Sequence, residues 1–127
     1  MRISHGQLMA VYPHDGEHFL LVQATWLMQE ENGGLIVGVA TLPGMPAGIG
    51  VRVAAVKAGN SERFVRAFLL PPVPTINEEG SIVLPPGMYQ ASRILEVSSG
   101  EESPWQLRMS HVLQRGTDYD RVSFQVI

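Results

Sequence analysis

HFLLVQATWLMQEENGGLIVGVATL, residues 18 to 42, carries the clearest fold signal in the sequence. Apolar side chains occupy every even position from Leu20 to Met28, while Gln23 and Thr25 lie between them, a period of two that is typical of a strand with one buried face. The turn QEENGG contains Asn-Gly, which adopts positive φ at low steric cost and therefore predicts a hairpin. Both faces of the second strand, LIVGVATL, are apolar, which predicts a central position in the sheet.

Strand patterns continue through the rest of the chain. The segments VRVAAV, RFVRAFLL, SRILEV, WQLRMSHVL and RVSFQVI read as extended, and the last two are expected to pair antiparallel through QRGTDYD. Alternation in WQLRMSHVL places His111 among core residues. A proline-rich crossing after residue 70 contains Ser81 to Leu84, which we expect to form a short edge strand because proline cannot donate to a sheet ladder.

These patterns define the expected fold class. No window carries a sustained helical period, and turn signals recur roughly every 8 to 12 residues, as in a barrel or a sandwich. We find no internal repeat and no linker that would divide the chain. The sequence therefore predicts an all-β fold, a small antiparallel β-barrel that forms a single domain over residues 1–127.

Composition excludes several classes of protein. Of the 127 residues, 45% are hydrophobic and 17% charged, which is too apolar for a disordered chain, yet no apolar run is long enough for a membrane span. A net charge of -3 gives no broad attraction to nucleic acid or anionic membranes. The chain has no cysteine, which excludes disulfides and thiolate metal sites. With an N-terminus that lacks a signal-peptide pattern, this makes a cytoplasmic location the expectation.

The glycine-rich stretch LPGMPAGIGVRV, from Leu42 to Val53, raises the question of a phosphate-binding loop. A dinucleotide fingerprint needs Gly-x-Gly-x-x-Gly at the start of a helix, whereas Gly44, Gly48 and Gly50 have a different spacing and precede a strand. We interpret the stretch as a strand connection whose glycines allow a tight turn or a bulge. A backbone nest that contacts a ligand is the alternative.

Patterns for catalysis and metal binding are weak. His14 and His18 flank a turn that contains Gly16, so they do not share a helix face, and no Gly-x-Ser-x-Gly elbow is present. The glutamates occur as adjacent pairs in polar turns, where solvation explains them better than acid-base catalysis. We therefore predict no enzymatic activity, no metal and no cofactor.

Arginines offer the strongest sign of ligand binding. Arg52, Arg63 and Arg66 fall on neighbouring segments that are expected to pair, and guanidinium groups are preferred partners of phosphate and of guanine edges. The alternative is that each arginine belongs to the polar face of a half-buried strand.

Two long segments resemble bacterial PilZ-type domains. LMAVYPHDGEHFLLVQATWLMQEENGGLIVGVATLPGMPAGIGVRV is similar to the later strands of such domains, with a V.A.W strand, a hairpin and a VGV strand. The continuation, from RAFLLPPVP to RVSFQV, is similar to the C-terminal extension of some multidomain PilZ-like proteins of proteobacteria. The resemblance implies a PilZ-like split β-barrel and a place in cyclic di-GMP signalling.

The sequence departs from the ligand motifs of that family. PilZ domains bind cyclic di-GMP through Arg-x-x-x-Arg and Asp/Asn-x-Ser-x-x-Gly. Here Arg63 and Arg66 are one residue too close, and EVSSG at Glu96 to Gly100 has Glu for Asp and is one residue short. No binding residue is carried over from the family.

These considerations favour a PilZ-like adaptor without catalysis that works through protein-protein contacts. Met88 and Tyr89 in the proline-rich crossing are the expected partner-binding anchors, and a homodimer or a hetero-complex is the expected assembly. Two alternatives remain open at this stage. One is a cyclic di-GMP receptor that uses Arg52, Arg63 and Arg66 in a non-standard way, and the other is a small-molecule enzyme.

Overall fold

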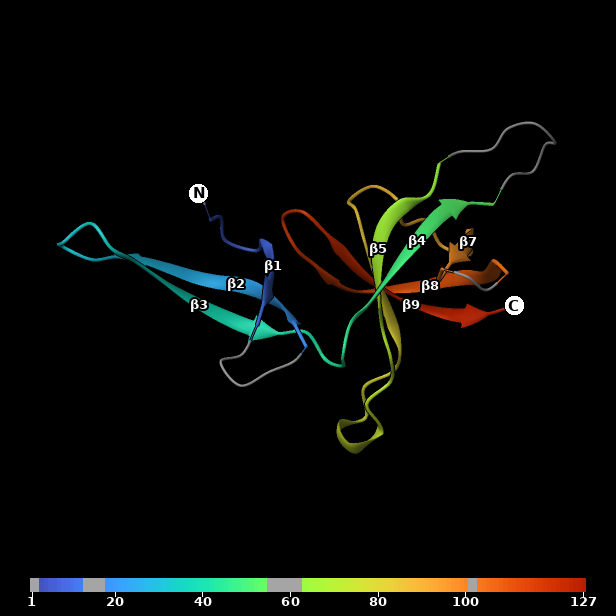
Figure 1. Ribbon diagram of the computed structural model, residues 1–127, viewed down its shortest axis with the longest axis horizontal. Helices are drawn as coiled ribbons and strands as arrows, with labels where there is room; N and C mark the ends of the chain where they lie inside the picture. The colour runs from blue at the N-terminus through green and yellow to red at the C-terminus, as the bar shows by residue number, and fades with distance from the viewer. Residues whose placement is uncertain (1–2, 13–17, 55–62, 101–102) are drawn as a thin grey trace.

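The computed structural model, which describes residues 3–12, 18–54, 63–100 and 103–127, is built almost wholly from strands (Figure 1). The strands β1 (Leu8–Val11), β2 (Leu20–Gln29) and β3 (Leu35–Thr41) form an antiparallel sheet in that order. Six further strands close into an antiparallel barrel in the order β4-β5-β6-β9-β8-β7. The bounds are β4 (Ala47–Val53), β5 (Val65–Leu70), β6 (Ser81–Leu84), β7 (Ile94–Ser98), β8 (Trp105–Arg115) and β9 (Asp120–Val126), with a 3-10 turn η1 (Pro74–Ile76) before β6. The predicted all-β class and small antiparallel barrel are confirmed.

The barrel interior is a closed apolar core. Alternate residues of each strand point inward, so that every barrel strand contributes side chains that exclude water. The buried members are Ile49, Val51, Ala67, Ile82, Leu84, Leu95, Val97, Leu107, Met109 and Val122.

A second core joins the N-terminal sheet to the outside of the barrel. Phe68, Leu70 and Val83 alternate with inward residues of β5 and β6. They form one apolar cluster with Leu21 of β2 and with Phe19, which directly precedes β2. The Phe19 and Phe68 rings meet edge to face, with centroids 5.9 Å apart and planes at 70°. The barrel strands thus span residues 47–126 and the preceding sheet packs on their outer face. The expectation of one domain over residues 1–127 stays a prediction.

Hydrogen bonds also join the N-terminal sheet to the barrel. The backbone N–H of Leu8 donates to Asp118 Oδ1 at 2.8 Å, and that of Thr117 donates to the Gly6 carbonyl at 2.8 Å. Gln114 Nε2 donates to Gln23 Oε1 at 2.9 Å. These contacts and the second core hold β1 on the turn between β8 and β9, and Gln23 of β2 on the end of β8.

The expectation of an edge strand at Ser81 to Leu84 is wrong. The β6 strand pairs with β5 on one side and β9 on the other, and all of its residues are buried. The flanking prolines, which suggested an edge, lie outside the strand and do not interrupt the ladder. Closure of the barrel removes edges altogether.

The glycine-rich stretch is a shorter connection than predicted. Gly48 and Gly50 lie inside β4, so that the connection comprises only residues 42–46. Gly44 is the turn residue: its φ is +91°, and a Cβ there would lie 2.8 Å from the carbonyl oxygen of Pro71. The interpretation as a strand connection with a glycine turn fits this geometry.

A bulge in β8 overturns the expected placement of His111. The pairing of β8 with β9 shifts register between Met109 and Val112, which inserts an extra residue and reverses the alternation. Val112 therefore packs against the core, whereas His111 is exposed.

Candidate interaction surface

The β2–β3 hairpin extends beyond the rest of the molecule as an arm, which we define as residues 25–39. Figure 1 shows it projecting away from the barrel, to the left of the view. The β1 strand pairs only with the first part of β2, up to Gln23, so that the arm consists of two strands that contact only each other among the described elements. At its end, Gly33 adopts a φ of +87° in the turn that returns the chain.

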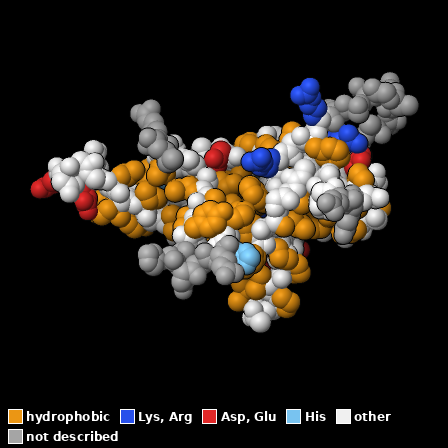
Figure 2. All heavy atoms as spheres, viewed as in Figure 1, with side chains coloured by type: hydrophobic (Ala, Val, Ile, Leu, Met, Phe, Trp, Pro, Cys, Tyr) orange, Lys and Arg blue, Asp and Glu red, His pale blue; other side chains and the backbone are white. Residues whose placement is uncertain are grey.

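The arm carries large apolar side chains on both of its faces. Trp26 pairs with Gly38 and Met28 with Ile36 on one face, and Leu27 pairs with Val37 on the other. The exposed fractions are 50% for Trp26, 51% for Met28, 49% for Leu35, 48% for Val39 and 38% for Leu27. Figure 2 shows hydrophobic side chains covering this arm, with acidic side chains at its end. Such a contiguous exposed apolar surface is typical of an interaction site.

Two predictions about this hairpin are wrong. The even positions of β2 were expected to form one buried face, but Val22 and Ala24 are buried while Trp26 and Met28 are exposed. A bulge between Ala24 and Trp26 changes the register of the strand. Beyond this bulge the strand extends past the barrel, which no longer covers either of its faces. The β3 strand was expected to be central, yet it lies at the edge of its sheet.

A groove continues the apolar surface from the arm toward the barrel. It has a volume of about 460 Å³ and lies between the root of the hairpin and the η1 turn. Met45 and Ile76 on its rim are 52% and 61% exposed. Its lining residues are Leu20, Thr41, Leu42, Pro43, Gly44, Met45, Ile76 and Glu78.

The charges beside this surface are acidic. Glu30 and Glu31 lie at the end of the arm, and Glu78 lines the groove. The sequence contains no Lys or Arg between Arg2 and Arg52. The arm itself therefore has no basic side chain.

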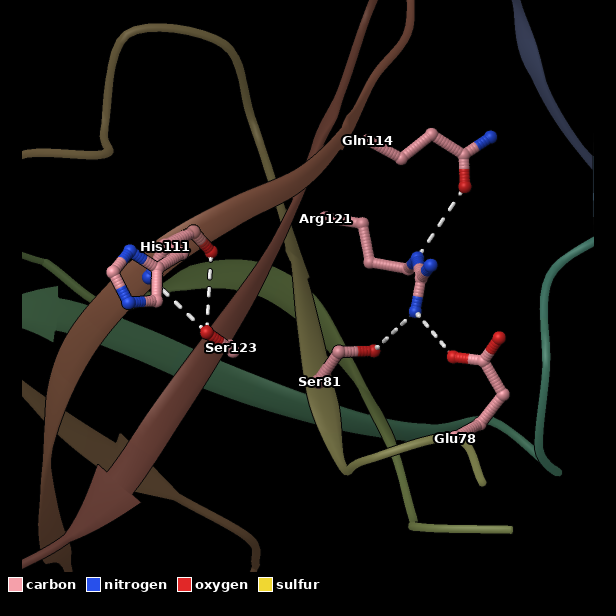
Figure 3. Close-up of polar contacts among 6 residues, drawn as sticks. All are labelled: Glu78, Ser81, His111, Gln114, Arg121 and Ser123. Carbon is pink, nitrogen blue, oxygen red and sulfur yellow. Dashed lines mark hydrogen bonds and ion pairs between the residues drawn. The ribbon is translucent and has the colours of Figure 1, made fainter. Parts of the chain in front are cut away.

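A buried arginine links the groove to the base of the arm (Figure 3). Arg121 on β9 is 8% exposed, and its Nε donates to Gln114 Oε1 at 3.3 Å. Its Nη1 donates to Ser81 Oγ at 3.4 Å and lies 3.8 Å from Glu78 Oε2. Since Gln114 also donates to Gln23, polar contacts run from the η1 side of the molecule to β2.

Tyr119 lies in the same polar network. It is 1% exposed, and its hydroxyl oxygen accepts a hydrogen bond from Gln114 Nε2 at 2.8 Å. Burial raises the pKa of Tyr119 to about 12, and the nearby Asp118 carboxylate adds to the increase. The Arg121 charge and the Gln114 hydrogen bond lower that pKa in part.

The Ser123 and His111 side chains are close in Figure 3 but do not form a nucleophile-base pair. The Ser123 hydroxyl accepts from the backbone N–H of His111 at 3.1 Å and donates to the His111 carbonyl at 3.4 Å. The imidazole takes no part in these bonds, and the figure shows it directed away from them. The pair stabilises the bulge of β8.

The structure places two of the three arginines expected to bind a ligand on one face of the barrel. Arg52 and Arg66 share the outer face of the barrel, because Arg66 pairs with Gly50 and Arg52 lies two residues further along β4. Arg63 is exposed in the segment that leads into β5.

Arg52 is already engaged in a bidentate contact. Its Nη2 lies 3.0 Å from Glu96 Oε1 and its Nε lies 3.4 Å from Oε2, while the guanidinium carbon is 4.2 Å from the centroid of the Phe64 ring. These contacts support the alternative that Arg52 belongs to the polar face of a strand. Arg66 is exposed and forms no ion pair with the residues that the structure describes.

The expected partner anchors Met88 and Tyr89 are half-buried and pack against the barrel core. The Tyr89 hydroxyl donates to the Ser110 carbonyl at 2.8 Å. Both side chains therefore contribute to covering the core, and their assignment as anchors stays a prediction. The exposed apolar surface lies instead on the hairpin arm, and the apolar character of both faces of LIVGVATL was the signal for it.

The histidines and the potential metal ligands of the sequence form no site among the described residues. His14 lies outside the described residues, whereas His18 is exposed. Within the described ranges there is no cluster of potential metal ligands. No helix in the described part of the chain has the length and apolar character needed to cross a membrane.

One comparison with known proteins gives a match. The family model of the FimW C-terminal beta-barrel domain matches residues 49–127, which comprise the barrel from within β4 to the end of the chain. No curated protein and no solved structure matches the chain.

Proposed function

The chain belongs to the FimW C-terminal beta-barrel domain family, and from this premise we propose that it is a non-catalytic regulatory or adaptor module connected with pili. We place it in the bacterial cytoplasm and in cyclic di-GMP-related signalling, as a PilZ-like barrel that acts through protein-protein contacts. The family membership supports the regulatory role, and the PilZ-like patterns of the sequence support the link to cyclic di-GMP.

The apolar arm is the observation that carries this proposal. Trp26, Leu27 and Met28 of β2 and Leu35 and Val39 of β3 expose large hydrophobic surfaces that the barrel does not cover. Leaving a half-exposed tryptophan or leucine in water forfeits roughly 1 kcal/mol of burial per side chain. Interfaces recover that free energy, and aromatic and methionine side chains are enriched in them.

The barrel itself offers little for catalysis. The Ser123 hydroxyl and the His111 imidazole are not bonded to each other. The cleft beside Arg66 has a volume of about 150 Å³, below the roughly 300 to 1,000 Å³ that enzyme and cofactor pockets usually enclose. A pocket of about 420 Å³ on the barrel falls within that range, but its lining residues supply no carboxylate and no imidazole for acid-base catalysis; they are Val53, Ala54, Gln90, Ala91, Ser92, Arg93 and Ile94. This geometry supports a role in binding rather than in catalysis.

Site-specific photo-crosslinking tests the proposal. We would place p-benzoylphenylalanine at position 27, on the arm, and at the exposed position of Gln106 on β8 as a matched control, and irradiate cells that express each full chain. We expect a covalent product with a second protein from position 27 and none from position 106. Mass spectrometry should assign that protein to the pilus machinery or its regulation. Equal labelling from both positions, or no heterologous product from position 27, would refute the adaptor function.

A cyclic di-GMP receptor is the second candidate function, and one observation favours it. Arg52 and Arg66 share a face of the barrel, and Arg66 has no ion pair among the described residues. Calorimetric titration with cyclic di-GMP, with GTP as control, tests it directly. Micromolar binding that Arg66→Ala abolishes and Arg108→Ala preserves would establish the receptor, whereas absence of heat at high protein concentration would leave the adaptor alone.

A further inference from the structure

The outer edge of β3 lacks the features by which edge strands usually avoid pairing. Among the described strands β3 contacts only β2, so its other side is open. Its sequence, Leu35–Thr41, contains no lysine, no proline and no charged residue, and the bulge of this hairpin lies in β2 rather than in β3. Natural edge strands are commonly protected by such residues or by bulges, and an unprotected apolar edge is a site for strand addition.

The hydrogen bonds to β2 identify which backbone groups of β3 are open. Glu30 N donates to the Gly34 carbonyl and Leu42 N donates to the Leu21 carbonyl, both at 2.8 Å. Bonded positions alternate along an antiparallel strand, so the even residues between these two points face β2. The N–H and C=O groups of the odd residues, which are Leu35, Val37, Val39 and Thr41, therefore point to the open edge.

We propose that this edge pairs antiparallel with the β3 edge of a second copy of the chain, about a two-fold axis at Gly38. This inference rests on the proposed function, because it takes the arm to be an interaction surface. It adds to that function by naming one partner of the arm, a second copy of the same chain. In this register Val37 lies opposite Val39 of the second copy, and Leu35 lies opposite its Thr41. Every open N–H and C=O of both strands then gains a partner.

Gly38 suits a position on the axis. In antiparallel pairs the positions that do not exchange hydrogen bonds bring Cα atoms closest, to about 4.5 Å. Gly38 has no side chain to obstruct this approach, and the Trp26 indole covers it, because a Cβ at this position would lie 2.0 Å from the ring. The two indoles would thus lie over the centre of the joined sheet.

Charge disfavours a parallel arrangement of the two arms. Pairing in parallel would place the acidic ends of the two arms, with Glu30 and Glu31, side by side. About a two-fold axis at Gly38 the two ends lie beyond opposite ends of a seven-residue strand. That strand is about 20 Å long, which exceeds the Debye length of about 8 Å at physiological salt.

The need for further strands also favours a second copy. An isolated two-stranded ribbon is marginally stable in water, whereas three or more strands with an apolar face are stable. The arm is such a ribbon, and pairing converts two ribbons into one four-stranded sheet, β2-β3-β3-β2. The joined sheet keeps both apolar faces, with Leu27 on one and Met28 on the other, available for the partner of the proposed function.

The size of the contact sets the expected affinity. One seven-residue strand from each copy is well below the 20 to 30 residues per side of a standard interface. We therefore expect a reversible dimer with a dissociation constant of roughly 1 to 100 µM rather than a permanent one.

Sedimentation velocity on the full chain from about 1 to 200 µM tests this inference. The weight-average mass should rise with concentration from the monomer value of 13.9 kDa toward twice that value. Val39→Lys should weaken association roughly tenfold or more, because it places two like charges beside the axis. The matched control is Val11→Lys on β1, at the opposite edge of the same sheet, which should leave association unchanged.

Disulfide trapping tests the register and does not depend on the lysine variant folding normally. The chain has no cysteine, so introduced thiols are unique. A mixture of Val37→Cys and Val39→Cys should oxidise to a crosslinked dimer, since directly opposed residues have a Cα separation compatible with a disulfide. Either variant alone should crosslink at least about tenfold more slowly, because identical positions are diagonal neighbours.

The outcomes separate this inference from the proposed function. A monomer at every concentration, a dimer equally weakened by Val11→Lys, or crosslinking that is no faster in the mixture would each overturn the pairing of β3 edges. None of these results affects the photo-crosslink from position 27 to a different protein. Conversely, a dimer with the expected crosslinks and no heterologous product would uphold the pairing and refute the adaptor.

Discussion

Replacing Tyr119 by phenylalanine should remove a loss of stability at alkaline pH. Tyr119 is 1% exposed, and burial raises its pKa to about 12 from the ordinary tyrosine value of 10.0. Between pH 10 and 12 the unfolded chain releases the phenolic proton while the folded chain retains it. Stability that is fully present below pH 10 is therefore lost as the pH rises toward 12.

The magnitude follows from the size of the shift. One unit of pKa corresponds to about 1.4 kcal/mol, so the free energy of unfolding should fall by up to about 3 kcal/mol over this window because of Tyr119 alone. At pH 8 the variant Tyr119→Phe should be about 1 kcal/mol less stable than the native chain, since it loses the hydrogen bond from Gln114. Gln114 Nε2 keeps its bond to Gln23, which limits this cost.

Urea denaturation at a series of pH values from 8 to about 12 measures both effects. Trp26 and Trp105 provide the fluorescence signal. The difference in stability between the native chain and Tyr119→Phe cancels the titration of other groups, and it should shrink and change sign as the pH rises. Tyr12→Phe, at a position that is 68% exposed, is the control. A difference that stays constant across the series would refute the reasoning.

Three further substitutions test the fold and the buried network. Gly44→Ala should destabilise the chain by about 1 to 3 kcal/mol in urea denaturation, because the positive φ of Gly44 and the nearby carbonyl of Pro71 exclude a side chain. Gly48 has open space around it, so Gly48→Ala should change stability little. Leu84→Ala in the barrel core should cost about 2 to 5 kcal/mol in the same assay, and a loss below 1 kcal/mol would contradict its burial. Arg121→Met should change the free energy of unfolding by less than about 2 kcal/mol. The polar contacts of Arg121, at 3.3 to 3.8 Å, are long and offset only part of the cost of burying its charge. A larger loss of stability in calorimetric melting would contradict this reasoning.

Local sequence patterns predicted most of the strands, because the alternation of apolar and polar residues within a strand reflects which of its faces is buried. The hairpin from Leu20 to Thr41 and the pair formed by β8 and β9 follow directly from alternation and turn residues. The burial of Ser81 to Leu84 was not predictable in the same way. Whether a short strand is central or at an edge depends on closure of the barrel by partners distant in sequence.

A bulge accounts for another error of placement. An inserted residue in β8 reverses the alternation without any change in the hydrophobic pattern, and this is why His111 is exposed although the period of two assigned it to a buried face. Trp26 is exposed for a different reason, since neither face of the arm is covered by the barrel. Arg52, Arg63 and Arg66 were correctly expected to lie on neighbouring segments. The contact of Arg52 with Glu96 joins residues 44 positions apart in the chain, and a local pattern cannot reveal it.

The error over β3 has a different origin and bears on function. A strand with two apolar faces is expected at the centre of a sheet because only there are both faces covered. The described part of this chain gives β3 a neighbour on one side only and leaves Leu35 and Val39 half-exposed. Positions where the sequence pattern and the fold disagree are often functional sites. The proposed pairing of two β3 edges would give this strand the second neighbour that its two apolar faces predict.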